Sequence, residues 1–392
     1  MSDELPRKKI VVLGATGSIG RSALEVVRRH PDLFEVTAIA AHTNVNLIAE
    51  QIAEFHPRYA AMGDKTAAAR LAERCPETTV YAGPEGLETV ASLPVDVVLC
   101  AMVGAAGLRP MFAAIDAGNR VAVSNKEPVV MAGKLIMERA AAGNADVIPV
   151  DSEHNAVFQC LHGHRREDVR CIHLTASGGP FYGKPRETLA RVTPEEATRH
   201  PTWDMGDKVS VDSATLMNKG LEIIEAMWLF GLPQDRIEVL IHPQSIVHGL
   251  VEFNDGSILA QMSVTDMKLP ILTALMWPDR VASPLKRLDL TAVGALQFAA
   301  PDFEQFPCLA HARRAAAEGG TAPAILNAAN EVGVQAFCNH RISFLDISEI
   351  VRITRDLCEA VYEYSLEDVL AADCLAREKA AQIVDRLERN HR

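Results

Sequence analysis

Short apolar runs alternate with amphipathic stretches of helix length over the first 150 residues, and this alternation limits the fold more than any other feature. Strands separated by helix-length segments form right-handed βαβ units, whose parallel sheet is covered by helices on both faces. We therefore predict an α/β fold that begins with a doubly wound parallel-sheet domain over residues 1–150. The predicted strands are Lys9–Leu13, Val36–Ala40, Tyr59–Met62, Asp96–Met102, Arg120–Val123 and Asp146–Val150.

A glycine-rich turn follows the first predicted strand. Its sequence, Gly14-Ala-Thr-Gly17-Ser-Ile-Gly20, opens the next predicted helix. Glycines let a backbone approach a pyrophosphate closely, and the free N–H groups of a helix N-terminus favour negative charge. The alternative is a strand-to-helix turn that binds nothing. Its place in the first βα unit favours a dinucleotide site in a Rossmann-like domain.

The segment after the second predicted strand bears on the choice between NAD and NADP. It contains His42, Thr43 and Asn44, and it offers no Asp or Glu to hold a ribose 2′-hydroxyl. Because an acidic residue there would repel a 2′-phosphate, its absence favours NADP.

The pattern changes at Asp151, and we predict a central α+β domain over residues 151–276. A polar stretch from Ser177 to Asp207 is expected to be an irregular functional segment. Three consecutive strand-like runs near the end of this domain suggest a meandering sheet. A proline-punctuated linker, 277–307, and a C-terminal helical bundle, 308–392, complete the prediction. The predicted elements are helices Ala156–Leu161, Met217–Phe230, Ala322–Cys338, Ile347–Ala360 and Ser365–Glu388, and strands Cys171–Ala176, Ile237–Ile241, Ile246–Phe253 and Ser257–Ser263.

Composition narrows the class of protein. A chain of 392 residues exceeds what one hydrophobic core usually supports, so several domains are expected. Its formal charge of -12 argues against nucleic acids and acidic membrane surfaces as partners. The eight cysteines are scattered without a CxxC pair, which is typical of reduced thiols. With neither a signal-peptide pattern nor a membrane-length apolar run, a cytoplasmic enzyme is expected.

Carboxylates at two places are candidates for binding a hard divalent cation. Asp151 and Glu153 occupy alternate positions where a predicted strand emerges, so both can point to one side. Glu222 is a third candidate if its helix packs nearby. The structural alternatives are that Asp151 or Ser152 caps a helix, and that Glu222 and Glu225 line a solvated helix face.

A zinc site is a competing interpretation. Cys160, His162, His164 and Cys171 have the donor types that zinc prefers. Their spacing matches no usual zinc module, and residues 162–168 have the composition of a charged surface loop. We therefore do not favour zinc at these residues.

With these motifs in hand, the chain resembles the 1-deoxy-D-xylulose 5-phosphate reductoisomerase family almost from end to end. The resemblance rests on several segments that occur in the family's order. They are GATGSIG at 14–20, AMVGAAGL at 101–108, SNKE at 124–127, PVDSEHNAVFQ at 149–159, TASGGPF at 175–181, HPTWDMGDKVSVDSATLMNKGLE at 200–222, HPQSIVHG at 242–249 and LNAANEVGVQAF at 326–337.

The resemblance implies an activity and its cofactors. Family members rearrange 1-deoxy-D-xylulose 5-phosphate and reduce the product with NADPH to 2-C-methyl-D-erythritol 4-phosphate, in non-mevalonate isoprenoid biosynthesis. The resemblance also implies a homodimer and a Mg²⁺ or Mn²⁺ ion held by Asp151, Glu153 and Glu222. Such an ion chelates the carbonyl and hydroxyl oxygens of the substrate.

The resemblance also assigns roles to individual residues. The catalytic set is Lys126, Glu153, His154, His200, Glu222 and His248. The substrate-binding set is Lys126, Ser152, Glu153, Ser177, His200, Trp203, Ser213, Asn218, Lys219 and Glu222. The cofactor-binding set is Gly14, Thr16, Gly17, Ser18, Ile19, His42, Thr43, Asn44, Asn125, Glu127, Gly206 and Met267.

Each of these residues also has an ordinary structural explanation. Ser177 can belong to a simple turn, Asn218 can cap a helix, and Lys219 can be a solvated charge. Trp203 closes over the substrate in the family's flexible loop, but a tryptophan in a loop can equally be a half-buried anchor.

The chain departs from the common family pattern at two places. His42-Thr43 stands where a Gly-Lys pair often precedes the Asn, and Pro128 stands where Ser often follows Lys-Glu. Without that lysine, the 2′-phosphate contact falls to backbone groups, to Thr43 and Asn44, or to Arg21.

Two other functions fit part of the pattern. A metal-free semialdehyde or homoserine-type dehydrogenase also begins with a glycine-rich βαβ turn. The semialdehyde enzyme needs an activated cysteine, whereas Cys100 and Cys160 lie in apolar runs. An NADP-binding sensor without activity is the second alternative, because a fold alone does not establish catalysis.

Overall fold

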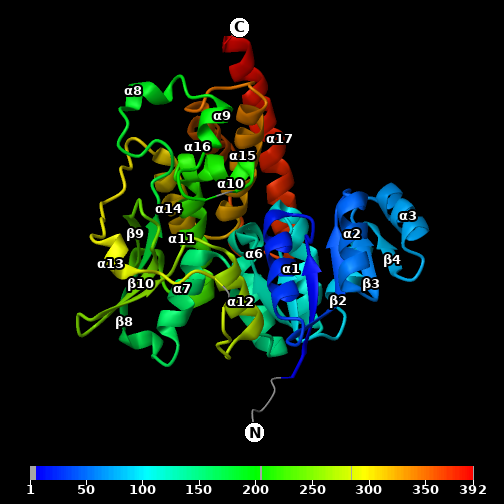
Figure 1. The fold of residues 1–392 in the computed structure, drawn as a ribbon. Coiled ribbons are helices and arrows are strands. Elements are labelled where there is room, and N and C mark those ends of the chain that lie inside the picture. Colours follow the sequence, from blue (N-terminus) through cyan, green and yellow to red (C-terminus); the bar gives the residue numbers. More distant parts are fainter. Residues whose placement is uncertain (1–5, 204, 284, 392) are drawn as a thin grey trace. The chain divides into compact units, whose positions relative to one another are not determined.

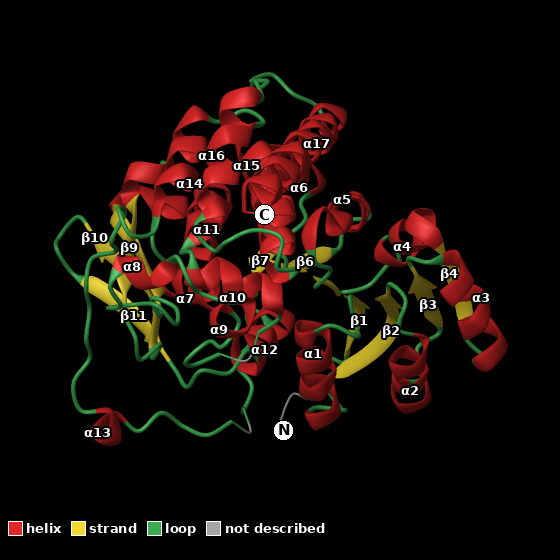
Figure 2. Ribbon diagram, turned by 90° about the horizontal axis from the view of Figure 1, so that it is seen from above, coloured by secondary structure: helices red, strands yellow, loops and turns green. Residues whose placement is uncertain are grey.

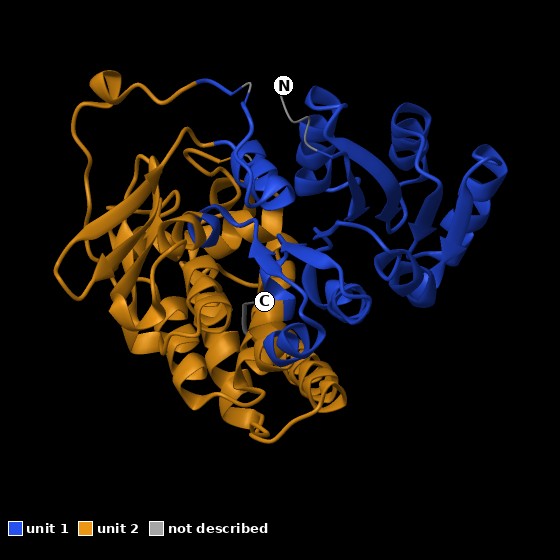
Figure 3. Cartoon of the chain, turned by 90° about the horizontal axis from the view of Figure 1, so that it is seen from below, with its two compact units in different colours: residues 1–128, 136–155, 266–286 blue, residues 129–135, 156–265, 287–392 orange. Residues whose placement is uncertain are grey.

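The structure is a computed structural model that describes residues 6–203, 205–283 and 285–391 (Figure 1). The chain forms two compact units, coloured separately in Figure 3. The first unit comprises residues 1–128, 136–155 and 266–286, and the second comprises 129–135, 156–265 and 287–392.

The first unit is built on a seven-stranded parallel sheet with the strand order β4-β3-β2-β1-β5-β6-β7. Figure 2 shows α1 and α2 on one side of the strands and α4 and α5 on the other. The strands are β1 (Lys8–Leu13), β2 (Phe34–Ala41), β3 (Tyr59–Met62), β4 (Thr79–Ala82), β5 (Val97–Cys100), β6 (Arg120–Val123) and β7 (Val147–Pro149). The helices are α1 (Ser18–Arg29), α2 (Val45–Phe55), α3 (Lys65–Arg74), α4 (Gly83–Ala91), α5 (Leu108–Asp116), α6 (Lys126–Gly143) and α12 (Lys268–Met276), with a 3₁₀ turn η1 (Gly104–Gly107).

The strand order confirms the predicted doubly wound sheet. The chain adds β2, β3 and β4 on one side of β1, then returns to add β5, β6 and β7 on the other. A crevice opens at such a switch point, beyond the carboxyl ends of the two central strands. In this sheet the switch point lies between β1 and β5.

The seventh strand, β4, was not predicted. Its four residues, Thr79–Ala82, lie at the edge of the sheet, and none of them is buried. A short edge strand lacks the continuous apolar run that marks a strand covered on both faces. Ile10, Val12 and Val98 in the central strands are 0% exposed and show the pattern that β4 lacks.

The second unit contains a four-stranded mixed sheet with the order β11-β10-β8-β9. Its strands are β8 (Val169–Ala176), β9 (Ile237–Ile241), β10 (Val247–Phe253) and β11 (Ile258–Met262). The predicted meander is wrong, because β8 lies between β9 and β10 and pairs in parallel with β9. A parallel pair needs a long crossover. The chain between β8 and β9 supplies one.

Helices make up most of the second unit and share one hydrophobic core with a face of this sheet. Ile172, Val239 and Val251 pack in the same cluster as residues of α11, α14 and α15. The helices are α7 (Ser152–Leu161), which begins in the first unit, α8 (Arg186–Leu189), α9 (Pro194–Ala197), α10 (Asp207–Ala214), α11 (Met217–Phe230), α13 (Leu290–Val293), α14 (Pro307–Glu318), α15 (Ala322–Cys338), α16 (Asp346–Leu357) and α17 (Leu366–His391), with 3₁₀ turns η2 (Arg166–Asp168) and η3 (Gln234–Arg236). The central α+β region and the C-terminal helices thus have the predicted classes of structure.

Within the described part of the chain, no helix combines the length and the apolar character needed to cross a lipid bilayer.

Candidate active site

The glycine-rich turn joins β1 to α1 at the switch point of the first sheet. Gly14 has a φ of +88°, and a Cβ there would lie 2.3 Å from the carbonyl oxygen of Ala101, just after β5. A Cβ on Gly20 would lie 2.2 Å from the carbonyl oxygen of Gly14. Both glycines are therefore required by close backbone packing.

The N-terminus of α1 is open to a ligand. Its N-cap, Gly17, provides no side-chain hydrogen bond, and Gly17 and Ser18 are exposed. Thr16 and Ile19 are partly exposed beside them. A solvent-facing helix N-terminus without a capping side chain suits a phosphate group.

The segment that follows β2 is also at the surface, and His42, Thr43 and Asn44 are all exposed. Asn44 has a structural role that the sequence pattern did not reveal. Its Oδ1 accepts a hydrogen bond of 3.1 Å from the N–H of Leu47 and caps α2. The amide nitrogen of Asn44 therefore remains the better candidate for a contact with a 2′-phosphate.

The start of α6 buries three consecutive polar residues of the first unit. Asn125, Lys126 and Glu127 are 7%, 8% and 5% exposed. The side-chain amide of Asn125 donates to the carboxylate of Glu127, and Lys126 Nζ lies 2.5 Å from a carboxylate oxygen of Asp151. Lys126 is therefore a buried ammonium group paired with a carboxylate and not an exposed surface charge.

Asp151 follows β7 and directly precedes α7. Its Oδ1 accepts from the N–H of Ser152 at 2.9 Å, while the Ser152 hydroxyl donates to Glu153 at 2.5 Å. His154 is fully buried, and its Nδ1 lies 4.0 Å from Asp151. Asp151, Ser152, Glu153 and His154 form one polar group in the first unit, with Lys126 as its cation.

The predicted phosphate-binding residues lie in the second unit. Ser177 follows β8, and its Oγ accepts a hydrogen bond from the N–H of Gly179 at 3.1 Å. A Cβ on Gly179 would lie 2.8 Å from the carbonyl oxygen of Ser213. The turn after β8 therefore packs against the end of α10, which brings the regions of Ser177 and Ser213 together.

His200 is held in one orientation by its backbone surroundings. Its Nδ1 accepts from the N–H groups of Thr202 and Trp203 at 3.2 and 3.0 Å. The ring proton therefore belongs on Nε2, which donates to the Oγ of Ser177 at 2.8 Å. Ser177 then receives two hydrogen bonds on its oxygen, and its own O–H points elsewhere.

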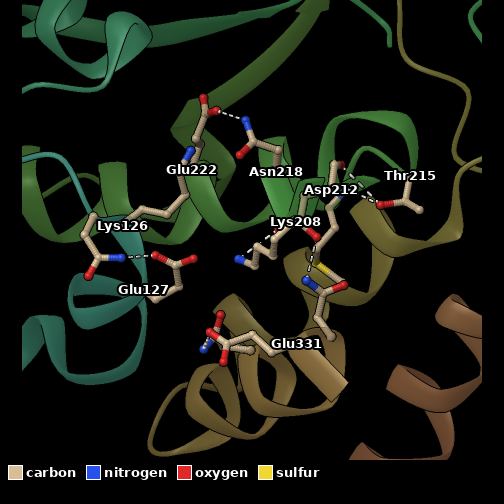
Figure 4. Close-up of polar contacts among 12 residues, drawn as sticks. Lys126, Glu127, Lys208, Asp212, Thr215, Asn218, Glu222 and Glu331 are labelled. Carbon is tan, nitrogen blue, oxygen red and sulfur yellow. Dashed lines mark hydrogen bonds and ion pairs between the residues drawn. The ribbon is translucent and has the colours of Figure 1, made fainter. Parts of the chain in front are cut away.

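The first turns of α11 gather Asn218, Lys219 and Glu222. Glu222 is 0% exposed, and its two carboxylate oxygens accept from Asn218 Nδ2 and Lys219 Nζ, each at 2.5 Å. Figure 4 shows the Asn218–Glu222 contact. The three side chains meet because residues three and four positions apart share one helix face. Since Glu222 is buried on that face, the alternative of a solvated helix face is wrong for this residue.

Comparison with known proteins identifies the family. Three family models of 1-deoxy-D-xylulose 5-phosphate reductoisomerase match residues 10–133, 147–230 and 262–379, the last two as C-terminal domains. The chain belongs to this family.

Relatives and solved structures of the family cover nearly the whole chain. The reductoisomerase of Dechloromonas aromatica (strain RCB) is 51% identical over 394 residues, which cover 98% of each chain. That of Paraburkholderia xenovorans (strain LB400) is 50% identical, with 97% of each chain covered. The Zymomonas mobilis enzyme in complex with NADPH has a TM-score of 0.91 at 43% identity, covering 96% of this chain and 99% of that one. A DOX-P reductoisomerase bound to NADPH, fosmidomycin and magnesium has a TM-score of 0.93 at 40% identity, covering 97% and 99%.

The reductoisomerase loop that contains Trp203 is only partly described, because Asp204 lies outside the described residues. The Trp203 and His248 rings have centroids 6.2 Å apart and are tilted by 57°. Gly206 is exposed and caps α10 in the second unit. Met267 precedes α12 in the first unit, and α12 packs against α1.

A buried ionic network in this reductoisomerase was missed by the sequence reasoning. Asp212 of α10 is 1% exposed, lies 2.9 Å from Lys208 Nζ, and accepts 2.7 Å from Asn330 Nδ2 of α15 (Figure 4). It anchors α10, the helix that contains Ser213. The spacing of Lys208 and Asp212, four residues apart, was the available signal.

Two alternatives from the sequence are not supported. Cys100 is buried, and burial raises the pKa of its thiol to about 12, which is the opposite of an activated nucleophile. Among the described residues, Cys160, His162 and His164 join no cluster of three potential metal ligands, whereas Cys171 lies with His173 and Glu238.

Proposed function

We propose that this chain performs the reductoisomerase reaction with the residues described above. Like other members of its family, it uses NADPH and a divalent metal ion to convert 1-deoxy-D-xylulose 5-phosphate to 2-C-methyl-D-erythritol 4-phosphate. The supporting observation is similarity over nearly the whole chain to reductoisomerases, including one bound to NADPH, fosmidomycin and magnesium.

We assign Asp151, Glu153 and Glu222 as the metal ligands, as the family implies. Three carboxylates fit Mg²⁺ or Mn²⁺, because both are hard cations that prefer oxygen. When bound, such an ion polarises the oxygens of the substrate and offsets negative charge that develops on them. Two of these carboxylates are each paired with a lysine in the structure, Asp151 with Lys126 and Glu222 with Lys219. A bound metal ion would replace the lysine ammonium group as the positive partner of each carboxylate.

The phosphate group of the substrate is assigned to Ser177, His200, Ser213, Asn218 and Lys219. The contacts of Ser177 support this assignment. Because its oxygen already accepts from His200 and Gly179, its O–H is available to donate to a phosphate oxygen. Ammonium, amide and hydroxyl donors together suit a dianion.

Lys219 and Asn218 both engage Glu222 in the structure. If Glu222 ligates a metal ion and Lys219 binds phosphate, each must exchange a partner when the ligands arrive. We propose that the buried Lys219–Glu222 pair keeps both charges compensated until then, since an unpaired buried charge is costly.

The other residues keep the roles implied by the family. Lys126 and Ser152 contact the oxygens of the substrate, His154 and His248 lie near the reacting carbons, and Trp203 closes the site against water. NADPH is assigned to the β1–α1 turn and to the remaining cofactor residues, His42, Thr43, Asn44, Asn125, Glu127, Gly206 and Met267.

We also propose that the enzyme is a cytoplasmic homodimer. All eight cysteines lie in the described ranges, and the structure pairs none of them in a disulfide, as expected in a reducing compartment. The edge strand β11 exposes Ile258 and Leu259 by 52% and 41%, which favours a covering partner. The division into domains at residues 150, 276 and 307 stays a prediction.

Purified protein with NADPH and 1-deoxy-D-xylulose 5-phosphate tests the activity. We expect NADPH oxidation that a chelator abolishes and that Mg²⁺ or Mn²⁺ restores. Absence of metal-dependent oxidation, with NADPH still bound, would indicate the NADP-binding sensor instead.

A Glu222→Gln variant tests the metal assignment. Removing one anionic ligand should raise the Mg²⁺ concentration needed for half-maximal activity at least tenfold and leave NADPH affinity nearly unchanged. Glu359→Gln, at an exposed position, is the matched control. An equal loss of metal support and NADPH affinity would contradict the assignment.

A further inference from the structure

Three potential metal ligands meet on the second sheet, on the face opposite its hydrophobic core. Cys171 and His173 alternate along β8 with Ile172 and Leu174, which belong to the core. Parallel pairing places Glu238 of β9 beside His173. The Cys171 Sγ, a His173 ring nitrogen and a Glu238 carboxylate oxygen all lie within 4.8 Å of one another.

The His173 ring is oriented by a second carboxylate. Its Nε2 lies 3.3 Å from Glu252 on β10, and Glu252 is also held by Arg170 at 2.8 Å. A carboxylate that accepts the proton of one ring nitrogen leaves the lone pair of the other nitrogen available for a metal. This carboxylate–histidine arrangement recurs around protein-bound zinc.

The other ring nitrogen of His173 has no hydrogen bond among the residues that the structure describes. Its Nδ1 is buried, and His173 as a whole is 8% exposed. An oxygen of Glu238 lies 3.3 Å away. With the proton on Nε2, the Nδ1 lone pair faces an anion, a repulsive arrangement that a cation between them would relieve.

Among the described residues, the nearby guanidinium group of Arg313 donates no hydrogen bond to the three proposed ligand atoms. Arg313 lies close enough to interact with Glu238 and Cys171, but its guanidinium donates to Gln234 and to the carbonyl oxygen of Ile237. Its charge balances Glu238 while the sulfur, the imidazole nitrogen and the carboxylate remain grouped.

We propose that Cys171, His173 and Glu238 form a second metal site, one that takes a borderline-soft divalent ion such as Zn²⁺. Thiolate and imidazole ligands favour Zn²⁺ over Mg²⁺, which prefers oxygen. Zinc bonds of about 2.0–2.3 Å require ligand atoms about 3.5 Å apart. The His173 and Glu238 atoms are 3.3 Å apart, and the Cys171 sulfur lies within 4.8 Å of both. Three protein ligands leave one position for water, and Glu252 positions His173 without touching the ion.

Co²⁺ is a suitable probe, because a cysteine–Co²⁺ bond gives a sulfur-to-metal charge-transfer band in the near ultraviolet. The full-length protein is titrated with Co²⁺ in millimolar Mg²⁺, which occupies hard oxygen sites, and bound Co²⁺ is then displaced with Zn²⁺. We expect one equivalent of thiolate-bound Co²⁺ per chain. Absence of the band would overturn the proposal.

Variants locate the site. Cys171→Ser should abolish the band, whereas Cys374→Ser, at an exposed cysteine, should leave it unchanged. Glu238→Gln changes a side chain that is 58% exposed, so the variant should fold and weaken Zn²⁺ binding at least tenfold. Glu252→Gln should weaken it about 10- to 100-fold through the orientation of His173. Unchanged Zn²⁺ affinity in Glu238→Gln would overturn the assignment of Glu238 as a ligand.

Discussion

Adding one methyl group at Gly20 tests whether the dinucleotide turn depends on close backbone packing. A Cβ at this position would lie 2.2 Å from the carbonyl oxygen of Gly14 and 2.6 Å from Cα of Ala15. Both neighbours are backbone atoms, so no side chain can rotate away. The turn itself must move in Gly20→Ala.

The magnitude follows from these distances. An ordinary contact requires about 3.4 Å, so the turn and α1 must separate by about 1 Å, and such overpacking costs about 1–3 kcal/mol of stability. A shift of this size breaks at least one hydrogen bond between the turn and the pyrophosphate. Hydrogen bonds to charged groups contribute about 1.5–3 kcal/mol, so the NADPH Kd should rise about 10- to 100-fold.

Gly118→Ala is the matched control. Gly118 has a φ of +75°, but a Cβ there meets nothing within 4 Å. This variant should lose about 1–2 kcal/mol from backbone strain alone and bind NADPH normally. Urea unfolding and NADPH fluorescence titrations measure both quantities. Wild-type NADPH affinity in Gly20→Ala would refute the packing argument.

Two further predictions concern the second unit. Ser177→Ala removes the hydroxyl assigned to phosphate and should lower kcat/KM about 10- to 100-fold, while Ser283→Ala, at an exposed serine, should not; equal kinetics would refute the assignment. Burial, and next the charge of Arg314, lower the pKa of His311 to about 4, below the value of about 6.5 expected in the unfolded chain. Between about pH 4 and pH 6.5 the unfolded chain therefore binds more protons at His311 than the folded chain does. The contribution of His311 to the free energy of unfolding is fully present above about pH 6.5 and is lost as the pH falls towards 4. Because the ring keeps some access to water, we expect a loss of about 1–2 kcal/mol. Urea unfolding of His311→Asn should show a flatter pH dependence, whereas His56→Asn, at an exposed position, should match the wild type; identical slopes in all three would contradict the reasoning.

The fold of the first unit was largely predictable because strands covered on both faces need continuous apolar runs. Residues 97–100 and 120–123 show such runs, and both are strands. The order of the second sheet was not predictable in this way. Apolar runs at β9 and β10 indicate strands, but the position of β8 between them depends on a crossover that local sequence does not encode.

The candidate site was predictable where chemistry depends on local spacing. Asn218, Lys219 and Glu222 lie within one turn and a half of helix, so their meeting follows from helical geometry. Contacts between distant segments were not predictable. Asp212 receives a hydrogen bond from Asn330, 118 positions away, and no local pattern marks these two side chains as partners.

Cys171 shows how strand register changes a prediction about chemistry. Read along the sequence, its nearest candidate co-ligands are Cys160, His162 and His164, and the structure assembles no site from them among its described residues. Alternation along β8 turns Cys171 and His173 to one face, and parallel pairing with β9 adds Glu238, 65 positions after His173. The zinc site that we propose from the strand register therefore shares only Cys171 with the site that sequence spacing suggested. Because any shift of β9 by one residue would turn Glu238 towards the core, Zn²⁺ binding also tests the register of this pair.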